Sequence, residues 1–317
     1  PRSGGVWLRV VIVGAGMSGL TAANELVAKG HEVTVLDKGR AVGGRMASKR
    51  FEGARFDHGA QHFSVRSAAF GEMVRELSFA GVVGVWYEGL SLTTDNGLEP
   101  RHRGVPAMRS ICEHLAEGLD VRTSALVAAV SSGGLTLDSG ERISADAVIV
   151  TAPIPQALDL MDPGLISVDD RLMLESIDYD PCIAVMAVLD RDPELPDGHL
   201  APDAGPIAWI ADSRHKGVSE IPAVTIHSTS DYARANLEAD AGVWLDDLLG
   251  EFERLTGTPV VTATAHRWRY SMPTNALDTG FLDLGSGVWL AGEAFSGARI
   301  EGAFTSGRAV AAAIATH

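Results

Sequence analysis

The chain contains very little cysteine and a clear excess of acidic over basic residues. Cys112 and Cys182 are its two cysteines, and they form no CxxC spacing. Neither a zinc site nor a disulfide framework is therefore predicted, no metal is expected, and a reducing cytoplasm is the expected compartment. The net charge is −15 over 317 residues. Because this charge repels polyanions, the sequence argues against nucleic acid and anionic membranes as partners.

Long hydrophobic runs are also missing. The apolar residues near the N-terminus are interrupted by Gly14, Gly16 and Gly19, and no signal-like cleavage pattern follows them. The Ala-rich segment before His317 is shorter than the roughly 20 residues that a membrane-spanning helix needs. We therefore expect a soluble protein, and the oligomeric state is not indicated.

A glycine pattern stands at the end of the first apolar strand, where residues 9–19 read RVVIVGAGMSG. Gly14 permits a tight turn, Gly16 lets the backbone approach a pyrophosphate, and Gly19 lets the next helix lie close to the strand. The N-terminus of that helix, expected over 18–29, offers unpaired N–H groups to phosphates. The pattern predicts a dinucleotide-binding turn.

The next strand, expected over 32–36, ends in Asp37, at about the position of a carboxylate that binds a ribose hydroxyl. An acid at this place argues against NADP as the resident cofactor. Gly43, Gly44 and Arg45 follow and supply main-chain and guanidinium donors for phosphate oxygens. An NAD dehydrogenase does not need this segment, so a permanently bound FAD is favoured.

Hydrophobic periodicity and turn residues predict the remaining elements. Helices are expected at 70–79, from 104–108 to near 118, at 239–255 and from about 300–302; strands at 82–92, 121–130, 147–150, 182–189, 207–211, 223–227 and 287–290; and turns at 95–97, 131–134 and 138–140.

Together with FDHGAQHF at 56–63, HRWRY at 266–270 and LAGEAFSGARIEGAFTSG at 290–307, these motifs resemble the flavin amine oxidase superfamily, and within it the renalase-like proteins. The resemblance implies an α/β fold of the amine oxidase and p-hydroxybenzoate hydroxylase type. This fold combines an FAD-binding Rossmann-like domain with a central parallel sheet and an α+β substrate domain with a mainly antiparallel sheet. The expected FAD-binding domain comprises 1–63, 101–154 and 271–317, and the substrate domain 64–100 and 155–270.

The resemblance also implies which residues hold FAD. Neither flavin-contact motif contains a cysteine, so the FAD is expected to be noncovalent. In the resembling family the strand that contains Val127 lends main-chain groups to the adenine, Glu293 accepts from ribityl hydroxyls, and the last helix directs its N-terminal amides at the flavin. The expected FAD contacts are Gly14, Ala15, Gly16, Met17, Ser18, Gly19, Asp37, Lys38, Gly44, Arg45, Met46, Gly59, Ala60, Gln61, Val127, Thr151, Gly292, Glu293, Glu301, Gly302 and Ala303.

The substrate-contacting residues are less clearly marked. If 266–270 is a strand, His266, Trp268 and Tyr270 share one face, which suits a flat heteroaromatic substrate, while Arg267 and Arg269 face carboxylates elsewhere. A core aromatic stripe is the alternative interpretation of that face. Gln61 and His62 are further candidates for a catalytic role, because the family places their loop beside the flavin ring. A solvated position is the alternative for His58.

Lysine is scarce as well. Monoamine oxidases resemble this chain but typically use a lysine that holds a water near the flavin, and the lysines here are Lys29, Lys38, Lys49 and Lys216. Lys216 lies in the polar segment 213–217, which predicts a loop. A deeply placed lysine is therefore not expected, and ordinary amine oxidation loses support.

The resemblance implies an FAD-dependent oxidase of renalase type. Such an enzyme takes a hydride from a small-molecule donor, a 2- or 6-dihydro-NAD(P) isomer, and passes the electrons to dioxygen, with NAD(P)+ and hydrogen peroxide as products. An amine oxidase or desaturase acting on a secondary-metabolite intermediate is the first alternative. A non-catalytic FAD-binding sensor is the second.

Overall fold

The computed structural model describes residues 7–90 and 97–316. The chain divides into two compact units, each described here by itself. Unit 1 comprises 1–44, 112–178 and 273–317, and unit 2 comprises 45–111 and 179–272. Unit 1 has a mainly parallel sheet and unit 2 an antiparallel one, so the expected fold class is confirmed.

Unit 1 is built on a six-stranded sheet in the order β17-β18-β11-β1-β2-β7. The strands are β1 Arg9–Val13, β2 Glu32–Leu36, β7 Asp120–Arg122, β11 Ala147–Val150, β17 Leu282–Asp283 and β18 Val288–Leu290. The five strands from β18 to β7 are parallel to one another, and β17 pairs antiparallel with β18 at the edge. Every residue of β11 is buried, as expected for a parallel strand covered on both faces.

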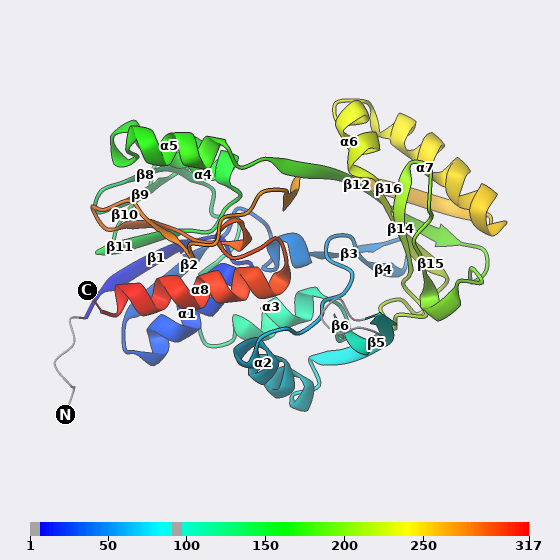
Figure 1. The fold of residues 1–317 in the computed structure, drawn as a ribbon, viewed down its shortest axis with the longest axis horizontal. Helices are drawn as coiled ribbons and strands as arrows, with labels where there is room; N and C mark the ends of the chain where they lie inside the picture. The colour runs from blue at the N-terminus through cyan, green and yellow to red at the C-terminus, as the bar shows by residue number, and fades with distance from the viewer. Residues whose placement is uncertain (1–6, 91–96, 317) are drawn as a thin grey trace. The chain divides into compact units, whose positions relative to one another are not determined.

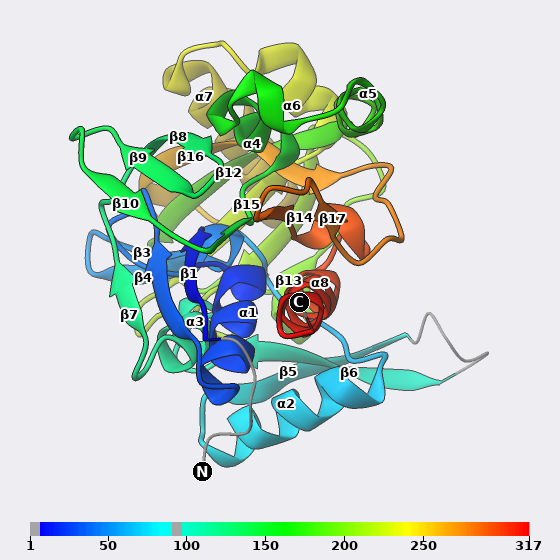
Figure 2. The ribbon, with the colours of Figure 1, turned by 90° about the vertical axis from the view of Figure 1, so that its left-hand side faces the viewer.

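Two helices of unit 1 lie side by side against this sheet, α1 Met17–Ala28 and α8 Ile300–Ile314. Figures 1 and 2 both show this pairing. A Cβ on Gly307 would lie 2.3 Å from the main-chain oxygen of Ser18. The last helix therefore contacts the first turn of α1 at a distance that only glycine allows.

The prediction of one strand over 121–130 is wrong, because the chain turns between residues 122 and 127. β7 ends at Arg122, and β8 Val127–Ser131 belongs to a separate three-stranded sheet with β9 Gly134–Leu137 and β10 Arg142–Ser144. Ser124 adopts φ +55° at the turn, and its N–H bonds the main-chain oxygen of Gly39 at 2.7 Å. Helices α4 Ile154–Leu160 and α5 Val168–Glu175 complete this part of unit 1.

Unit 2 contains a five-stranded sheet in the order β13-β14-β15-β12-β16. The strands are β12 Tyr179–Leu189, β13 His199–Leu200, β14 Ile207–Asp212, β15 Ala223–Ser228 and β16 Val260–Pro273. Helices α6 Ser230–Asn236 and α7 Ala241–Thr256 lie on one face of it (Figure 1). Trp244, Leu248 and Phe252 of α7 pack into the core formed with the buried residues of β12, β14 and β15.

Three further pieces belong to unit 2: the hairpin of β3 Ser48–Phe51 and β4 Ala54–Asp57, the helix α2 Ala68–Phe79, and the hairpin of β5 Val83–Leu90 and β6 Leu98–Gly104. α2 lies along the second hairpin (Figure 2). Helix α3 Arg109–Leu115 spans the boundary between the units. Part of the expected turn at 95–97 falls outside the described residues.

The boundaries of the compact units differ from those of the expected domains. Residues 45–63, 101–111 and 271–272 lie in unit 2, and residues 155–178 lie in unit 1. The physical reason for the first difference is the packing of β4, since Ala54 and Phe56 form a buried cluster with Met186, Val188 and Ala223 of the unit 2 sheet. Among the described residues, no helix has the length and apolar character needed to cross a membrane.

Candidate functional site

In the glycine turn after β1, the surroundings of each glycine differ. Gly14 adopts φ +111°, and a Cβ there would lie 2.4 Å from Thr151 Oγ1. A Cβ on Gly19 would lie 2.0 Å from the main-chain oxygen of Gly14. A Cβ on Gly16 would meet no atom within 4 Å. Packing therefore explains Gly14 and Gly19, whereas the open space at Gly16 is a cradle that a ligand's phosphates fit.

Polar groups around this turn also fit a dinucleotide. Gly16 is the N-cap of α1 and supplies no side-chain cap for the first N–H groups, which are the donors that a phosphate uses. The buried Ser18 Oγ has no partner among the described residues. Asp37 accepts the N–H of Ala15 and the N–H of Gly39, both at 2.7 Å, so its carboxylate is fixed beside the turn.

The second glycine pair lies against the first turn within unit 1. The N–H of Gly43 bonds the main-chain oxygen of Ala15 at 2.9 Å. Gly44 adopts φ +52°, and a Cβ there would lie 3.6 Å from the Cα of Gly16. The structure thus brings the two glycine motifs together.

The other expected FAD contacts of unit 1 lie at the ends of its elements. Gly292 follows β18 with φ +141° and donates its N–H to Ser306 Oγ at 2.8 Å. Glu293 and Glu301 are buried. The remaining residues of this group are Met17 in α1, Lys38 after β2, Val127 at the start of β8, Thr151 after β11, and Gly302 and Ala303 in α8.

Five expected FAD contacts belong to unit 2 instead: Arg45, Met46, Gly59, Ala60 and Gln61. The loop of Gly59 lies against the short helix η1 Gly44–Met46, because a Cβ on Gly59 would lie 2.0 Å from the main-chain oxygen of Arg45. That oxygen accepts the N–H of Ala60 at 2.9 Å.

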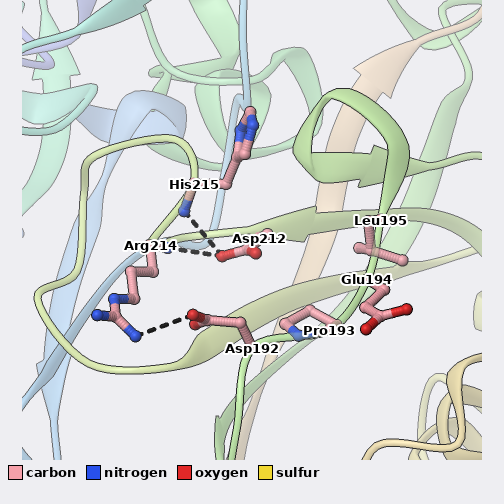
Figure 3. A pocket seen from close by; sticks show the side chains of 7 residues that line it. All are labelled: Asp192, Pro193, Glu194, Leu195, Asp212, Arg214 and His215. Atoms are coloured by element: carbon pink, nitrogen blue, oxygen red, sulfur yellow. Dashed lines mark hydrogen bonds and ion pairs between the residues drawn. The ribbon is translucent and has the colours of Figure 1, made fainter.

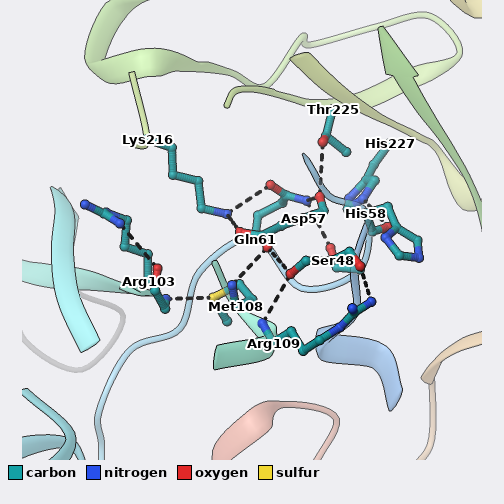
Figure 4. Close-up of polar contacts among 12 residues, drawn as sticks. Ser48, Asp57, His58, Gln61, Arg103, Met108, Arg109, Lys216, Thr225 and His227 are labelled. Atoms are coloured by element: carbon teal, nitrogen blue, oxygen red, sulfur yellow. Dashed lines mark hydrogen bonds and ion pairs between the residues drawn. The ribbon is translucent and has the colours of Figure 1, made fainter. Parts of the chain in front are cut away.

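A buried ion pair lies at the start of the same loop. Lys216 Nζ is 2.9 Å from Asp57 Oδ2, and each side chain is 1% exposed (Figure 4). Burial lowers the pKa of Lys216, and the nearby Asp57 carboxylate opposes this. The expectation that no lysine is deeply placed is wrong. Lys216 does lie in the turn between β14 and β15, but its side chain points into the unit.

Asp57 is bonded at both carboxylate oxygens. Oδ1 accepts from Ser48 Oγ at 2.6 Å and from the N–H of Met108 at 2.9 Å, while Oδ2 meets Lys216 (Figure 4). These additional hydrogen bonds offset the desolvation cost of burying the pair.

Gln61 joins this network through both ends of its amide. Its Nε2 donates to the main-chain oxygens of Asp57 and Gly59, and its Oε1 accepts from Lys216 at 3.3 Å. The side chain expected to be a catalytic candidate is therefore engaged within the protein, where it holds the loop.

His266 and Trp268 lie together on β16, as the strand alternation predicts, with ring centroids 4.5 Å apart. Both contact His58, which stacks on Trp268 at 5.4 Å and meets His266 edge-on at 4.9 Å. His58 is 7% exposed, so the solvated alternative for this residue is wrong. Tyr270 packs separately on Tyr179 at 5.6 Å.

The outward face of β16 also follows the prediction. Arg267 Nη1 is 2.8 Å and Arg269 Nη2 is 2.6 Å from the carboxylate of Glu238. Both arginines thus meet one acid on the surface of unit 2.

Five aromatic rings from four segments of unit 2 form a second group, here named the aromatic cluster: His62, Trp86, Tyr87, His199 and Trp209. His199 lies between Tyr87, at 4.2 Å, and Trp209, at 4.6 Å, with stacked rings. His62 contacts Trp86, Tyr87 and Trp209 at 5.3–6.2 Å. The ring atoms His62 Nδ1, Trp86 Nε1 and Trp209 Nε1 are buried and have no hydrogen-bond partner among the described residues.

A surface pocket of about 350 Å³ lies on the other side of the β14–β15 turn and is lined by Asp192, Pro193, Glu194, Leu195, Asp212, Arg214 and His215 (Figure 3). An exposed ion pair joins Arg214 and Asp192 at 2.9 Å. Asp212 Oδ1 accepts the N–H groups of Arg214 and His215, so these groups are already satisfied within the protein. Among the described residues, no cluster of metal-ligating side chains occurs.

Sequence reasoning missed Asp57, Lys216 and most of the aromatic cluster. Asp57 carried a usable signal, because it ends the strand ARFD two residues before Gly59, and an acid that is buried there requires a partner. Trp86, His199 and Trp209 carried none, since the strands that bring their rings together are distant in sequence.

Comparisons with known proteins identify the family of the chain. A family model described as flavin containing amine oxidoreductase matches residues 69–315, and one described as NAD(P)-binding Rossmann-like domain matches residues 12–77. The chain belongs to the family of flavin-containing amine oxidoreductases. It is accordingly an oxidoreductase that uses FAD.

Among curated proteins, the chain is similar to 4,4'-diapophytoene desaturase from Staphylococcus haemolyticus, with 48% identity over 52 residues. The corresponding desaturase of Staphylococcus aureus is 42% identical over 52 residues. Each match covers 16% of this chain and 10% of the relative. The alignments thus span about a tenth of the length of these desaturases.

Solved structures share the fold at low identity. A putative protoporphyrinogen oxidase from Exiguobacterium sp. 255-15 matches with a TM-score of 0.78 and 14% identity over 100% of both chains. Putrescine oxidase bound to putrescine matches with a TM-score of 0.75 and 16% identity, over 98% of this chain and 100% of that chain. Reduced UDP-galactopyranose mutase matches with a TM-score of 0.70 and 14% identity, over 98% of this chain and 96% of that chain.

The cradle around Gly16 predicts that Asp37→Asn weakens FAD binding by about 10- to 100-fold, the range for losing a hydrogen bond to a charged group. Titration of the apoprotein with FAD, followed by quenching of flavin fluorescence, measures this. Asp120→Asn is the matched control, because Asp120 lies exposed on the neighbouring strand β7. Equal affinities in the two variants would contradict the assignment of Asp37.

The buried histidines of unit 2 predict loss of stability in mild acid. Burial lowers the pKa of His58 to about 3 and those of His62 and His227 to about 4. Unfolded histidine binds a proton near pH 6.5. Between there and about pH 4, the unfolded chain therefore takes up protons that the folded chain excludes. The free energy of unfolding falls with decreasing pH by up to about 1.4 kcal/mol per pH unit for each histidine.

Urea unfolding between about pH 7 and about pH 4.5 measures this slope. His227→Gln is expected to flatten it, while its amide can still donate to the main-chain oxygen of His58, which His227 Nε2 contacts at 3.2 Å. An unchanged slope would show that His227 takes up its proton equally in both states.

Proposed function

We propose that this protein is an FAD-dependent oxidase of renalase type that takes a hydride from 2- or 6-dihydro-NAD(P) and passes the electrons to dioxygen. The products are NAD(P)+ and hydrogen peroxide. When bound, FAD supplies the two-electron acceptor for this reaction. The chain's own residues bind and orient the substrate and the cofactor.

The aromatic cluster of unit 2 is the observation that carries the proposal. Three of its ring nitrogens, His62 Nδ1, Trp86 Nε1 and Trp209 Nε1, are buried without partners among the described residues, and buried groups of this kind usually have one. A planar ring with a carboxamide brings both a stacking surface and hydrogen-bond acceptors. A dihydronicotinamide has this chemistry.

The charges near the cluster disfavour a cationic amine. Lys216 Nζ lies 5.0 Å from the centroid of the Trp86 ring and occupies the position that an amine cation would take over an aromatic face. After burial, the largest causes that lower the pKa of His62 are the charges of Lys216 and Arg101. A neutral substrate ring avoids repulsion by both cations.

The hydride-transfer step requires positioning rather than proton transfer, and the proton that hydrogen peroxide takes up later comes from solvent. A dihydropyridine donates hydride from carbon, so no side chain has to remove a proton first. The polar side chains of the 57–62 loop network are already engaged within the protein, since Lys216 is paired with Asp57 and the Gln61 amide is held at both ends.

We propose that FAD is held by the glycine turn and Asp37 of unit 1 together with the other expected contacts. In unit 1 these are Gly14, Ala15, Gly16, Met17, Ser18, Gly19, Asp37, Lys38, Gly44, Val127, Thr151, Gly292, Glu293, Glu301, Gly302 and Ala303; in unit 2 they are Arg45, Met46, Gly59, Ala60 and Gln61.

A desaturase or amine oxidase acting on a small biosynthetic intermediate is the second candidate. The local similarity to 4,4'-diapophytoene desaturases favours the desaturase within this pair. An apolar desaturase substrate would leave the buried nitrogens of the aromatic cluster unpaired, and an amine cation would meet the charges of Lys216 and Arg101. The dihydronicotinamide is therefore preferred.

Anaerobic mixing of the oxidised holoprotein with each donor tests the proposal. We expect rapid bleaching of the flavin absorbance with 2- or 6-dihydro-NAD(P), and peroxide release once oxygen is admitted. Putrescine and benzylamine represent the amine class, and ordinary 4-dihydro-NAD(P) is the matched isomer control. Bleaching by an amine but by no dihydronicotinamide would overturn the proposed function.

A further inference from the structure

The hairpin of β5 and β6 places two arginines on the face that carries part of the aromatic cluster. Across the hairpin, Arg101 lies opposite Tyr87 and Arg103 lies opposite Gly84. Opposite side chains of an antiparallel pair share one face, as do residues two apart on a strand. Because Tyr87 belongs to the aromatic cluster, both arginines lie on the cluster's side of the hairpin. Gly84 has no side chain that could cover Arg103.

Arg101 is already engaged within the hairpin. Its guanidinium forms an ion pair with Glu99, and its Nη2 donates to the main-chain oxygen of Leu90 at 2.6 Å. The two side chains of this ion pair are 11% and 15% exposed. The charge of Arg101 is therefore balanced by an acid of its own strand.

Arg103 has no such partner. Within residues 7–90 and 97–316 it forms no ion pair, and its one hydrogen bond joins Nη1 to the main-chain oxygen of Gly104 at 3.3 Å. The guanidinium lies against the β14–β15 turn, since a Cβ on Gly217 would lie 3.0 Å from Nη2, and it points away from Asp57 (Figure 4). A guanidinium carries five N–H donors. Most donors of Arg103 are thus available to a ligand.

Two other cations near the aromatic cluster are each matched by an acid. Lys216 is paired with Asp57, and Arg101 is paired with Glu99. Arg103 is half-buried and adds one positive charge to these two neutral pairs. Burial lowers the pKa of Lys216, and the charge of Arg103 lowers it further. An anion bound at Arg103 therefore balances the local charge.

The aromatic cluster supplies the features of a site for a planar ring on the same side of the hairpin. Trp86 Nε1 and Trp209 Nε1 are buried N–H donors without a partner among the described residues. Lys216 Nζ, which responds to the charge of Arg103, lies 5.0 Å from the centroid of the Trp86 ring. This part of unit 2 thus combines a stacking surface, unpaired donors and one unpaired cation. A ligand with a planar neutral ring and an anionic group uses all three.

We propose that Arg103 binds a phosphate of the ligand whose planar ring occupies the aromatic cluster. The inference rests on the proposed function, because the phosphates of a dihydronicotinamide nucleotide are its anionic groups. A planar guanidinium bonds two phosphate oxygens at once. Arg103 therefore determines specificity, and the protein binds a nucleotide more tightly than the nucleoside that lacks the phosphate.

Two matched pairs of compounds test the phosphate site without turnover. Nicotinamide mononucleotide and nicotinamide riboside carry the same oxidised ring and differ by one phosphate. Phenyl phosphate and phenol also differ by a phosphate and contain no nicotinamide. Each compound is titrated into the oxidised holoprotein by calorimetry. We expect the phosphate-bearing member of a pair to bind about tenfold more tightly, as hydrogen bonds to a charged group imply.

Arg103→Met is expected to remove this preference and to leave the affinities for nicotinamide riboside and phenol unchanged, which loss of structure alone would not do. Arg50→Met is the matched control, because it removes the same charge from an exposed position on β3, and it is expected to keep the preference. If Arg103→Met does not fold, Arg103→Gln decides instead, since its amide can still donate to the main-chain oxygen of Gly104.

A phosphate preference that survives in the folded Arg103 variant, or no preference in either pair with the wild-type protein, overturns the inference. The proposed function is tested separately, through bleaching of the flavin. Bleaching by dihydronicotinamides together with no phosphate preference refutes the inference alone. A phosphate preference that depends on Arg103, together with no bleaching by any dihydronicotinamide, refutes the proposed function alone.

Discussion

The buried ion pair between Lys216 and Asp57 is the interaction on which the candidate site of unit 2 depends. Two charges that are each 1% exposed have lost nearly all contact with water, and their mutual attraction alone seldom compensates for this loss. Here Ser48 and the main chain of Met108 bond the remaining carboxylate oxygen. The pair and its hydrogen bonds thereby connect four parts of unit 2: the β3–β4 hairpin, the loop of residues 57–62, the residue before α3 and the β14–β15 turn.

Unit 1 meets a different physical constraint, the close approach of backbone to backbone. Gly14, Gly19 and Gly307 each leave too little space for a Cβ, whereas Gly16 faces open space. Packing accounts for the first three glycines, and the open space at the fourth fits the phosphates of the proposed dinucleotide. Unit 1 therefore offers main-chain donors at a helix end, whereas unit 2 offers a loop held by hydrogen bonds and a group of aromatic rings.

Much of unit 1 could be predicted from the sequence because its signals are local. The order of strand, glycine turn, helix, strand and Asp37 lies within about 30 residues, the length of one βαβ unit, and α8 follows a glycine-rich segment that matches the family. The strand over 121–130 was wrong, because Ser124 turns the chain with a positive φ that serine rarely adopts. No pattern of apolar residues indicates such a turn.

The site of unit 2 was less predictable because its partners are distant in sequence. A polar segment around Lys216 predicts a loop, which is correct, but the direction of one side chain depends on Asp57, more than 150 residues earlier. Trp86 on β5 and Trp209 on β14 are likewise distant in sequence, although their rings are in contact. The alternation of β16 was visible, and it correctly paired His266 with Trp268 and turned Arg267 and Arg269 outward.

The coupling energy between Lys216 and Asp57 tests the central claim most directly. A double-mutant cycle of Lys216→Met, Asp57→Asn and the combined variant, measured by urea unfolding at neutral pH, isolates it. The account predicts that Lys216→Met alone costs about 3–5 kcal/mol, because it leaves a buried carboxylate without its cation, and that the combined variant costs far less than the sum of the two single changes. Additive effects of the two substitutions would show that the ion pair does not organise the site.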